Sequence, residues 1–306
     1  MQGLGSRALA VGRLGLAVAT AGLALTGVLV AVTAPGDADP VGRTVTAAAA
    51  VGCAASGAYH PPGPGSVGVP PGLRLCPSGS VTVTAADTVL DGLDVTGGIV
   101  VDAPGVVVRR SRITGNGSTP YGVSTTSAGS VRIEDTTITG AFSEAGIGDD
   151  AWTAERVEIT RVSGDGARLG SRATLRNSRL HDLVPAAGRS TAALRLVAPG
   201  GDVLVENNRI EMGRGPGHDS AVLLAPAQRG RGETAGEGAV VIRGNLLGGG
   251  EYTLRQVPVS GGAVPDVRIT GNQFRRDALA GPLQVPATSL LADNVFVDGG
   301  AVSGRG

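Results

Sequence analysis

The sequence predicts an all-β fold, a single-stranded right-handed parallel β-helix of about nine coils. One short pattern recurs along most of the chain: alternating β-branched residues, a small polar residue, a variable residue, an apolar residue and a turn. The 3.6-residue period of a helix is not visible after the first 34 residues. Among 306 residues only one Trp, three Tyr and three Phe occur. A narrow core of small branched side chains needs few aromatic residues.

Each of the nine copies of the repeat ends on an apolar anchor. The intervals between anchors run from 18 residues (95 to 113) to 37 residues (210 to 247), which suits one coil with longer loops on one side. We expect the anchors to stack in one interior column, and the long loops between positions 180 and 247 to form a cleft. The anchors are Val95, Ile113, Ile138, Ile159, Leu180, Ile210, Leu247, Phe274 and Phe296.

The position two residues before the anchor favours small polar side chains. A tight turn needs a residue that tolerates the left-handed αL conformation and bonds locally, and Asn does both. Because stacked coils lie about 4.8 Å apart, Asn side chains in register predict a hydrogen-bonded ladder, the alternative being unrelated turns. The residues at this position are Ser111, Thr136, Val157, Ser178, Asn208, Asn245, Asn272 and Asn294.

A second short strand follows each loop, and its register predicts which side chains point inward. Alternation along a strand then places the next residue on the outer face. The residues expected to point inward are Val123, Ile147, Ala167, Leu194, Val222 and Leu254. Arg168, Arg195 and Arg255 each follow one of these and form an outward stripe, interrupted by Leu223.

The N-terminal residues 1–34 predict a signal peptide or an N-terminal membrane anchor. Arg7 and Arg13 precede an uncharged apolar stretch over residues 14–34, which is long enough to span a bilayer. Residues 35–52 are rich in Pro, Ala and Thr and predict a linker. Either N-terminal reading places the remaining chain outside the cytoplasm, secreted or at the cell surface.

Residues 53–80 predict an N-terminal cap, and residues 81–306 the β-helix. The two cysteines, Cys53 and Cys76, follow the export segment, and an even count in an exported chain favours a disulfide over two unrelated buried thiols. The open end of a β-helix exposes apolar core and strand edges. We expect the segment between the cysteines to fold back over the first coil.

Four segments carry a resemblance to a known family. They are residues 66–73 (SVGVPPGL), 88–97 (TVLDGLDVTG), 164–170 (GDGARLG) and 180–183 (LHDL). With them, residues 53–298 resemble the actinobacterial secreted right-handed parallel β-helix proteins of the pectate-lyase-like superfamily. The resemblance implies a polysaccharide lyase, hydrolase or epimerase, or a non-catalytic adhesin.

The chain departs from that family at one place. Many relatives carry a His-x-Asp-Gly-(Val/Ile)-Gln segment after the His-Asp-Leu turn, whereas this chain reads Ser-Thr-Ala-Ala-Leu-Arg over residues 190–195. The imidazole and the carboxylate are both missing. The chain also contains no Lys, so a lyase would need Arg as its base, and Arg is a poor one.

Three carboxylates are the candidate catalytic residues: Asp149, Asp150 and Asp165. The first two follow one copy of the second strand, and Asp165 lies one coil later. Together they could serve as acid and base or hold Ca²⁺, the one cofactor considered; the alternative is that all three are turn residues. No spacing of His or Cys predicts a metal site.

Other polar and aromatic residues give weaker signals. His181-Asp182 and His218-Asp219 are the two His-Asp pairs, and we interpret both as loop residues rather than catalytic dyads. Trp152 and Tyr121 could stack against sugars, although a lone aromatic residue more often fills a loop or covers a coil.

The Arg168, Arg195 and Arg255 stripe is the candidate substrate-binding surface. Guanidinium groups suit the carboxylates or sulfates of an acidic polysaccharide, and the alternative is a solvated face paired with nearby acids. The 26 Arg are balanced by 26 acidic residues, so nothing points to nucleic acid, and we expect a monomer.

The sequence therefore predicts an exported β-helix protein that binds or processes extracellular or cell-envelope polysaccharide. If the protein is an enzyme, the expected activity is that of a polysaccharide lyase or a glycoside hydrolase. The alternative is a non-catalytic surface protein, an adhesin or spacer, that has lost its enzymatic residues.

Overall fold

The computed structural model of the chain describes residues 43–46, 50–52, 66–148, 150–197, 202–225, 238–257 and 266–303. The segment expected to be a signal peptide or anchor, 1–34, lies outside these residues. No helix within the described parts is long and apolar enough to cross a membrane.

The described strands form three parallel sheets, each with ten strands. Sheet A contains β1 (Arg43–Val45), β4 (Val81–Val83), β7 (Ile99–Val101), β10 (Tyr121–Thr125), β13 (Ala145–Ile147), β16 (Asp165–Leu169), β19 (Leu194–Leu196), β22 (Val222–Leu224), β25 (Tyr252–Gln256) and β28 (Gly281–Gln284). Sheet B contains β2 (Ala50–Gly52), β5 (Val89–Asp91), β8 (Val106–Arg109), β11 (Val131–Glu134), β14 (Trp152–Glu155), β17 (Thr174–Arg176), β20 (Val203–Glu206), β23 (Ala239–Arg243), β26 (Asp266–Thr270) and β29 (Leu290–Ala292). Sheet C contains β3 (Cys76–Ser78), β6 (Leu93–Thr96), β9 (Arg112–Asn116), β12 (Thr137–Ala141), β15 (Glu158–Thr160), β18 (Arg179–His181), β21 (Arg209–Glu211), β24 (Leu246–Gly248), β27 (Gln273–Phe274) and β30 (Val295–Phe296).

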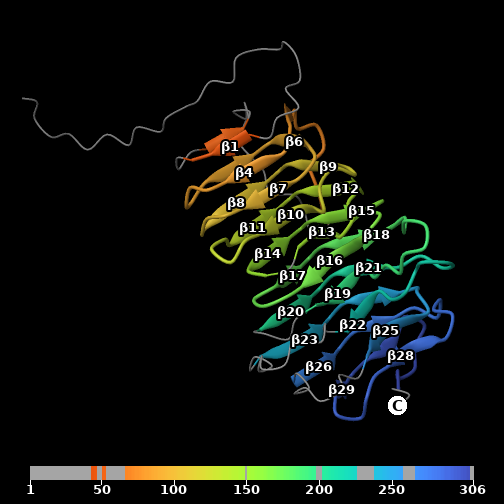
Figure 1. Ribbon diagram of the computed structural model, residues 1–306. Helices are drawn as coiled ribbons and strands as arrows, with labels where there is room; N and C mark the ends of the chain where they lie inside the picture. The colour runs from red at the N-terminus through yellow and green to blue at the C-terminus, as the bar shows by residue number, and fades with distance from the viewer. Residues whose placement is uncertain are drawn as a thin grey trace, which may run out of the picture.

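Every strand pairs with the strand three places along the chain, so each coil passes once through sheets A, B and C. The coils stack into an elongated solenoid from β1 at one end to β28 and β29 at the other (Figure 1). The predicted parallel β-helix is confirmed, with ten coils in the described residues where nine were expected.

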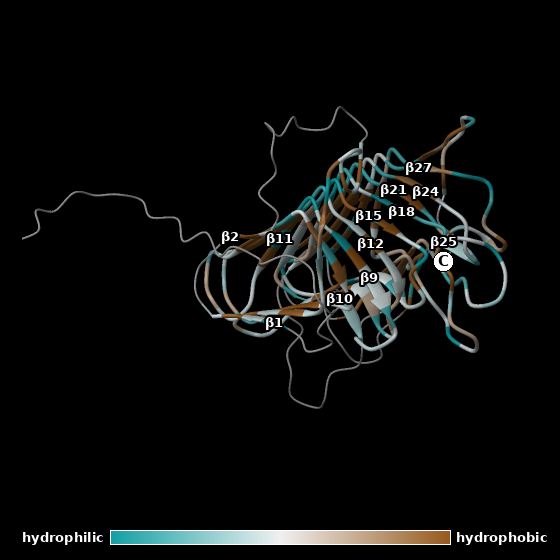
Figure 2. Cartoon of the chain, turned by 90° about the horizontal axis from the view of Figure 1, so that it is seen from above, coloured by the Kyte–Doolittle hydropathy of each residue, from teal (hydrophilic) through white to brown (hydrophobic). Residues whose placement is uncertain are grey.

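The predicted interior column is confirmed in full. Ile113 pairs with Ile138, and the pairing continues one anchor at a time to Phe296. In sheet A the predicted inward column from Val123 to Leu254 is in register as well. Burying one such Ile or Leu side chain stabilises the fold by about 1.5–3 kcal/mol. Figure 2 shows these hydrophobic strand segments along the sheets.

Trp152 belongs to this core and is not a sugar platform. Its side chain is 1% exposed, and its indole Nε1 donates to the backbone carbonyl of Arg168 at 3.2 Å. The interpretation of Trp152 as a residue that fills the interior of the coil is therefore confirmed.

The turn from sheet B to sheet C is nearly the same in every coil from β5 onward. The αL residue stands immediately before the ladder position, and not at it as the sequence suggested, so the Asn side chains bond between coils while their neighbours make the turn. The αL residues are Gly92, Arg110, Asp135, Arg156, Asn177, Asn207, Gly244, Gly271 and Asp293, with φ between 46° and 69°.

The predicted asparagine ladder is confirmed. The backbone N–H of Asn245 donates to Oδ1 of Asn272 at 3.0 Å, and the Asn245 amide Nδ2 donates to the same oxygen at 2.9 Å. The same pair of bonds joins Asn208 to Asn245 and Asn272 to Asn294. All four side chains are buried. In an earlier coil the Ser178 hydroxyl accepts the N–H of Val157 at the same position.

The β-helix begins earlier than the sequence suggested. Strands β1 and β2 lie inside the segment interpreted as a linker, and β3 lies inside the one interpreted as a cap. These strands have only three residues each and few large apolar side chains, so they show too little of the repeat to be recognised. Together they add the tenth coil.

Residues 66–75 precede β3 and lie along sheet C rather than over the open end of the helix. The N–H of Gly68 donates to the Arg156 carbonyl at 2.8 Å, and the N–H of Val69 donates to Thr137 Oγ1 at 3.0 Å. Gly68 has a φ of 77°, and a Cβ there would lie 2.5 Å from Thr137 Oγ1. In its described part, the excursion between β2 and β3 therefore packs against β12 and β15.

The disulfide remains a prediction, because Cys53 lies outside the described residues. Gly52 pairs with Asp91 and Cys76 pairs with Leu93, two residues further on. In the next coil, the single residue Gly92 joins the two positions with which Gly52 and Cys76 pair. The end of β2 and the start of β3 are therefore close enough for a tight turn to join them. Cys76 itself is partly buried and packs against the core.

Candidate functional site

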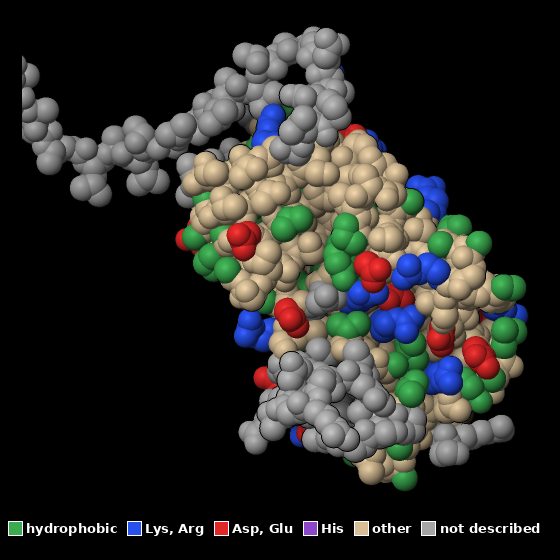
Figure 3. Space-filling view, in the orientation of Figure 1, with side chains coloured by type: hydrophobic (Ala, Val, Ile, Leu, Met, Phe, Trp, Pro, Cys, Tyr) green, Lys and Arg blue, Asp and Glu red, His purple; other side chains and the backbone are tan. Residues whose placement is uncertain are grey.

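The outer face of sheet A divides into two halves. One outward column runs through all its coils, and its members in the first coils are small or uncharged. From β16 onward the same column carries arginines, and Figure 3 shows acidic and basic side chains gathered over the middle and lower coils. In chain order the column contains Thr44, Thr82, Val100, Ser124, Gly148, Arg168, Arg195, Leu223, Arg255 and Gln284.

The arginine stripe has the predicted register, but its charges are paired within the protein. Arg168 pairs directly with Arg195 in the sheet, and Leu223 separates Arg195 from Arg255. Two guanidinium groups on neighbouring strands repel each other unless a carboxylate lies close by. Asp165 is that carboxylate.

Asp165 begins β16 and is 4% exposed. Its Oδ2 lies 2.7 Å from Arg195 Nε and 3.5 Å from Arg168 Nε. Its Oδ1 accepts the N–H of Ala192 at 2.9 Å. A buried carboxylate with two arginines and a backbone donor holds neighbouring coils together, and it is poorly placed to exchange protons with a ligand.

Arg168 is fixed from the other side by Tyr121 and Glu144. Its Nη1 donates to the Tyr121 hydroxyl at 2.9 Å, and its Nη2 donates to Glu144. Burial by itself would lower the pKa of Arg168, yet the pKa is raised from its ordinary value because Tyr121, Glu144 and Asp165 favour the charged guanidinium. Arg168 therefore stays protonated.

Tyr121 lies across the sheet because Gly148 leaves room for it. A Cβ on Gly148 would lie 2.9 Å from Cδ1 of the Tyr121 ring. The ring spans from β10 over β13, and its hydroxyl reaches Arg168 on β16. The centroid of the ring is 5.6 Å from the Arg168 guanidinium carbon.

The structure does not bring Asp150 to Asp165. Asp150 lies in the turn after β13, where its Oδ1 accepts the N–H of Ser171 at 2.5 Å. Asp165 pairs with Ala145 at the start of the same strand, so Asp150 stands five residues further along, about 16 Å away at 3.3 Å per residue. Asp149, the third predicted carboxylate, lies outside the described residues.

A groove lies beside the arginine stripe, at the loops that lead from sheet C into sheet A. It has a volume of about 700 Å³, within the range of ligand sites. The loops at 185–190 and 215–219 form much of it, so the cleft expected between anchors 180 and 247 exists. The groove is lined by Pro185, Ala186, Ala187, Gly188, Arg189, Ser190, Gly215, Pro216, Gly217, His218, Asp219, Glu251, Leu279 and Ala280.

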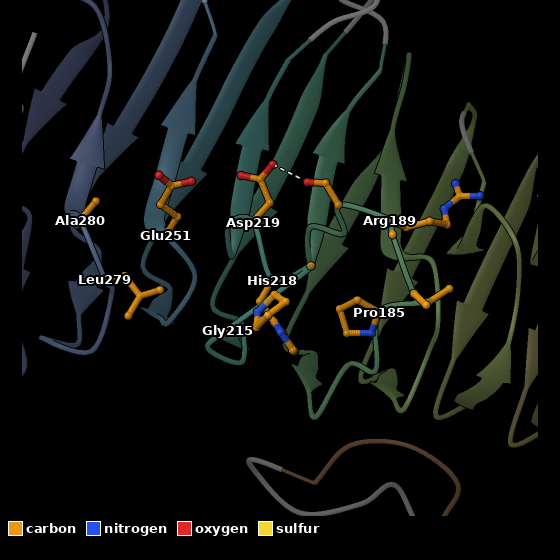
Figure 4. Close-up of a pocket in the computed structure, with 14 residues that line it drawn as sticks. Pro185, Arg189, Gly215, His218, Asp219, Glu251, Leu279 and Ala280 are labelled. Carbon is orange, nitrogen blue, oxygen red and sulfur yellow. Dashed lines mark hydrogen bonds between the residues drawn. The ribbon is translucent and has the colours of Figure 1, made fainter.

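Asp219 and Glu251 come to the groove from neighbouring coils. The N–H of Glu251 donates to the Asp219 carbonyl at 2.6 Å, so the two residues are stacked. Asp219 accepts from the hydroxyls of Ser190 at 2.8 Å and Ser220 at 3.0 Å. Figure 4 shows both carboxylates on the same side of the strands, with the Arg189 side chain directed away from them.

His218 does not form a dyad with Asp219. Its Nε2 lies 3.2 Å from the Leu183 carbonyl, which can only accept, so Nε2 carries the proton. Its Nδ1 is buried and has no hydrogen-bond partner among the described residues. His218 therefore fastens its loop to the preceding one and forms part of the groove lining.

His181 contacts its neighbouring aspartate, contrary to the loop interpretation, but on sheet C. Its Nδ1 lies 2.7 Å from Asp182 Oδ2, and its Nε2 lies 3.2 Å from Glu158 Oε1. This cluster belongs to the sheet against which residues 66–75 pack, and it is separate from the groove.

No group of three or more His, Cys, Asp or Glu residues that could hold a metal ion occurs in the part of the chain that the structure describes. The carboxylates considered for Ca²⁺ do not converge there, since Asp150 and Asp165 lie at opposite ends of a strand.

Sequence reasoning missed Glu251 and Glu144. Val222 pairs with Leu254, three residues after Asp219 and Glu251 respectively, so the repeat register already places these two acids in line. The alignment of Asp219 with Glu251 could therefore have been read from the sequence. Glu144 stands one residue before β13, and that its side chain reaches Arg168 on the next strand could not be read from the pattern.

Comparisons with protein-family models, with curated proteins and with solved structures found no match to this chain.

Proposed function

We propose that the protein is an exported β-helix protein that binds polysaccharide in the groove beside sheet A. One observation carries the proposal: two irregular loops and two stacked carboxylates form an open groove of about 700 Å³ on an otherwise regular solenoid. Hydroxyl, carboxylate and backbone groups line it, and these are the partners that sugar hydroxyls need. Pro185, Pro216 and Leu279 offer apolar surface for the faces of sugar rings.

The wider assignment to the pectate-lyase-like superfamily is part of this proposal. It is supported by the parallel β-helix and by the four sequence segments that resemble that group. The export segment supports a location outside the cytoplasm. The paired charges on sheet A fit a monomer that does not bind nucleic acid.

If the protein cleaves its ligand, hydrolysis is the reaction that the groove favours. Asp219 and Glu251 stand on neighbouring coils, as a pair of carboxylates flanking one glycosidic bond would. A lyase needs a base beside a uronate, and Arg168 is held in its charged form. Asp219, which accepts hydrogen bonds from the hydroxyls of Ser190 and Ser220, and Glu251 would be the two carboxylates that hydrolysis requires.

The alternative, a binding or spacer protein without catalysis, is favoured by one observation. Asp165, Arg168 and Arg195, three of the residues that sequence reasoning selected, bond to one another and support the stacking of coils. Binding in the groove needs none of their chemistry.

The full-length protein should be screened against neutral, acidic and amino-bearing polysaccharides, with binding, reducing ends and unsaturated products all measured. Ala280→Trp, which fills one end of the groove, should abolish binding. Val100→Trp, on the same sheet face but outside the groove, should leave it unchanged. Equal binding by both variants would rule the groove out as the site.

A further inference from the structure

The charges on the sheet A face decide what kind of glycan the groove can accept. Arg168 and Arg195 share Asp165, and Arg168 also bonds Glu144. Two positive charges thus meet two negative ones inside one network. A uronate arriving at this face would have to displace a carboxylate that is already in place.

Arg189, which lines the groove, and Arg255, which lies beside Asp219, also face carboxylates of the protein. Arg255 Nη1 lies 3.8 Å from Asp219 Oδ1, and Arg189 Nη2 lies 3.9 Å from Glu144 Oε1. Figure 4 shows Arg189 directed away from the groove carboxylates. Among the described residues that line the groove, no arginine therefore lacks an acidic neighbour.

Glu251 is different. Its side chain is exposed at the groove, and it makes no salt bridge within the described residues. It is stacked on Asp219, whose charge Arg255 offsets only at 3.8 Å. Leu279, 64% exposed, lines the groove as well. The groove thus combines an uncompensated carboxylate with an apolar surface.

We infer that the ligand of this groove is a glycan bearing free amino groups, with an ammonium group at Glu251 and Asp219, rather than a polyuronate. The inference rests on the proposed function and specifies its substrate class. An ammonium group supplies the positive charge that the groove lacks, and its hydrogen bonds to carboxylates are stronger than those of a neutral amide. An N-acetyl group at the same position would supply neither the positive charge nor the stronger hydrogen bonds to the two carboxylates.

The test is a titration of the full-length protein with three oligosaccharides of equal length: glucosamine, N-acetylglucosamine and galacturonate tetramers. The glucosamine tetramer should bind about tenfold more tightly than its acetylated form, and the galacturonate tetramer should bind most weakly. Glu251→Gln should remove most of that preference. Asp87→Asn, which removes one negative charge from an exposed turn elsewhere, should leave the preference intact.

Two results would overturn the inference alone: equal binding of the amino and acetylated tetramers, or a preference that Glu251→Gln leaves unchanged. In both, the sugar still binds and the groove remains the site. Tightest binding by galacturonate would also overturn it. Failure of every saccharide to bind would overturn the proposed function itself.

Discussion

Two corners of the solenoid are built in different ways. At the corner between sheets B and C, every coil from β5 onward turns through one αL residue, and the buried residue after it bonds to the next coil. At the corner between sheets C and A, the connections range from residues 97–98 to residues 182–193. There, ion pairs among exposed and half-buried side chains join neighbouring coils.

The difference shows where this fold allows variation. The B–C corner is fixed by hydrogen bonds between buried residues at the same position of successive coils, so an inserted residue would break the bonds to the coils on both sides. The C–A corner is held by long side chains that reach across loops of any length. The groove has formed at the second corner. Four predictions test the contrast, from the largest expected effect to the smallest.

Asn272→Leu should cost about 3 kcal/mol of unfolding free energy, measured by chemical denaturation. The change removes two hydrogen bonds accepted from Asn245 and two donated to Ile242 and Asn294, each contributing about 1 kcal/mol. Asn116→Leu, on an exposed strand end, is the matched control and should cost under about 0.5 kcal/mol. Equal effects would mean that burial in the ladder contributes nothing.

The first B–C turn differs from the others, because residues 53–75 leave the corner between β2 and β3. A Cys53–Cys76 disulfide would close a loop of 24 residues (53 to 76) and stabilise the fold by about 3 kcal/mol in the chain-entropy model. Intact mass with and without reductant and alkylation tests the bridge. Two thiols that alkylate freely in the oxidised native protein would exclude it.

At the C–A corner, Asp165→Asn should cost about 2 kcal/mol, because it leaves Arg168 and Arg195 half-buried without their shared carboxylate. Glu251→Gln should change stability by less than about 0.5 kcal/mol while altering ligand binding. The opposite pattern, a stable Asp165→Asn protein that has lost activity, would restore Asp165 as a catalytic residue.

Glu211 should make the C–A corner sensitive to acid. A hydrogen bond from Arg209 lowers the pKa of Glu211 from its ordinary 4.5, with Arg275 and Arg179 adding to the effect. Because the folded-state pKa is the lower one, the stabilisation is complete above about pH 4.5 and disappears as the pH falls through the folded-state value. Glu211→Gln should therefore cost about 0.5 kcal/mol at pH 7 and nothing at pH 2. The cost of Asn272→Leu should not depend on pH in the same way.

The sequence predicted the B–C corner and the core well because both repeat. The anchor column, the inward column of sheet A and the ladder each need one residue type once per coil, and that periodicity is visible without coordinates. The position of the αL residue was misplaced by one, since Arg and Asp occupy it in four coils, nearly as often as Asn and Gly, which occupy it in five.

The site was predicted less well because it depends on side chains that cross between loops. The register of Arg168, Arg195 and Arg255 was correct, but whether a guanidinium is free or paired depends on Glu144 and Asp165, whose side chains reach arginines on neighbouring strands. Asp165 stands two residues before the inward-pointing Ala167, whereas Asp150 stands three residues after the aligned Ile147. The register of the repeat therefore already separated the two carboxylates.

The regular B–C corner makes a single coil an exchangeable part. Arg112 pairs with Thr137 and Ile113 with Ile138. Strand β9 of one coil and strand β12 of the next therefore begin at equivalent positions and run in the same direction. Excising residues 112–136 would join Ser111 to Thr137 and leave every remaining column aligned, in a protein one coil shorter. The molecule could thus be shortened or lengthened in whole steps, and the groove, several coils away, could be carried on a scaffold of chosen length.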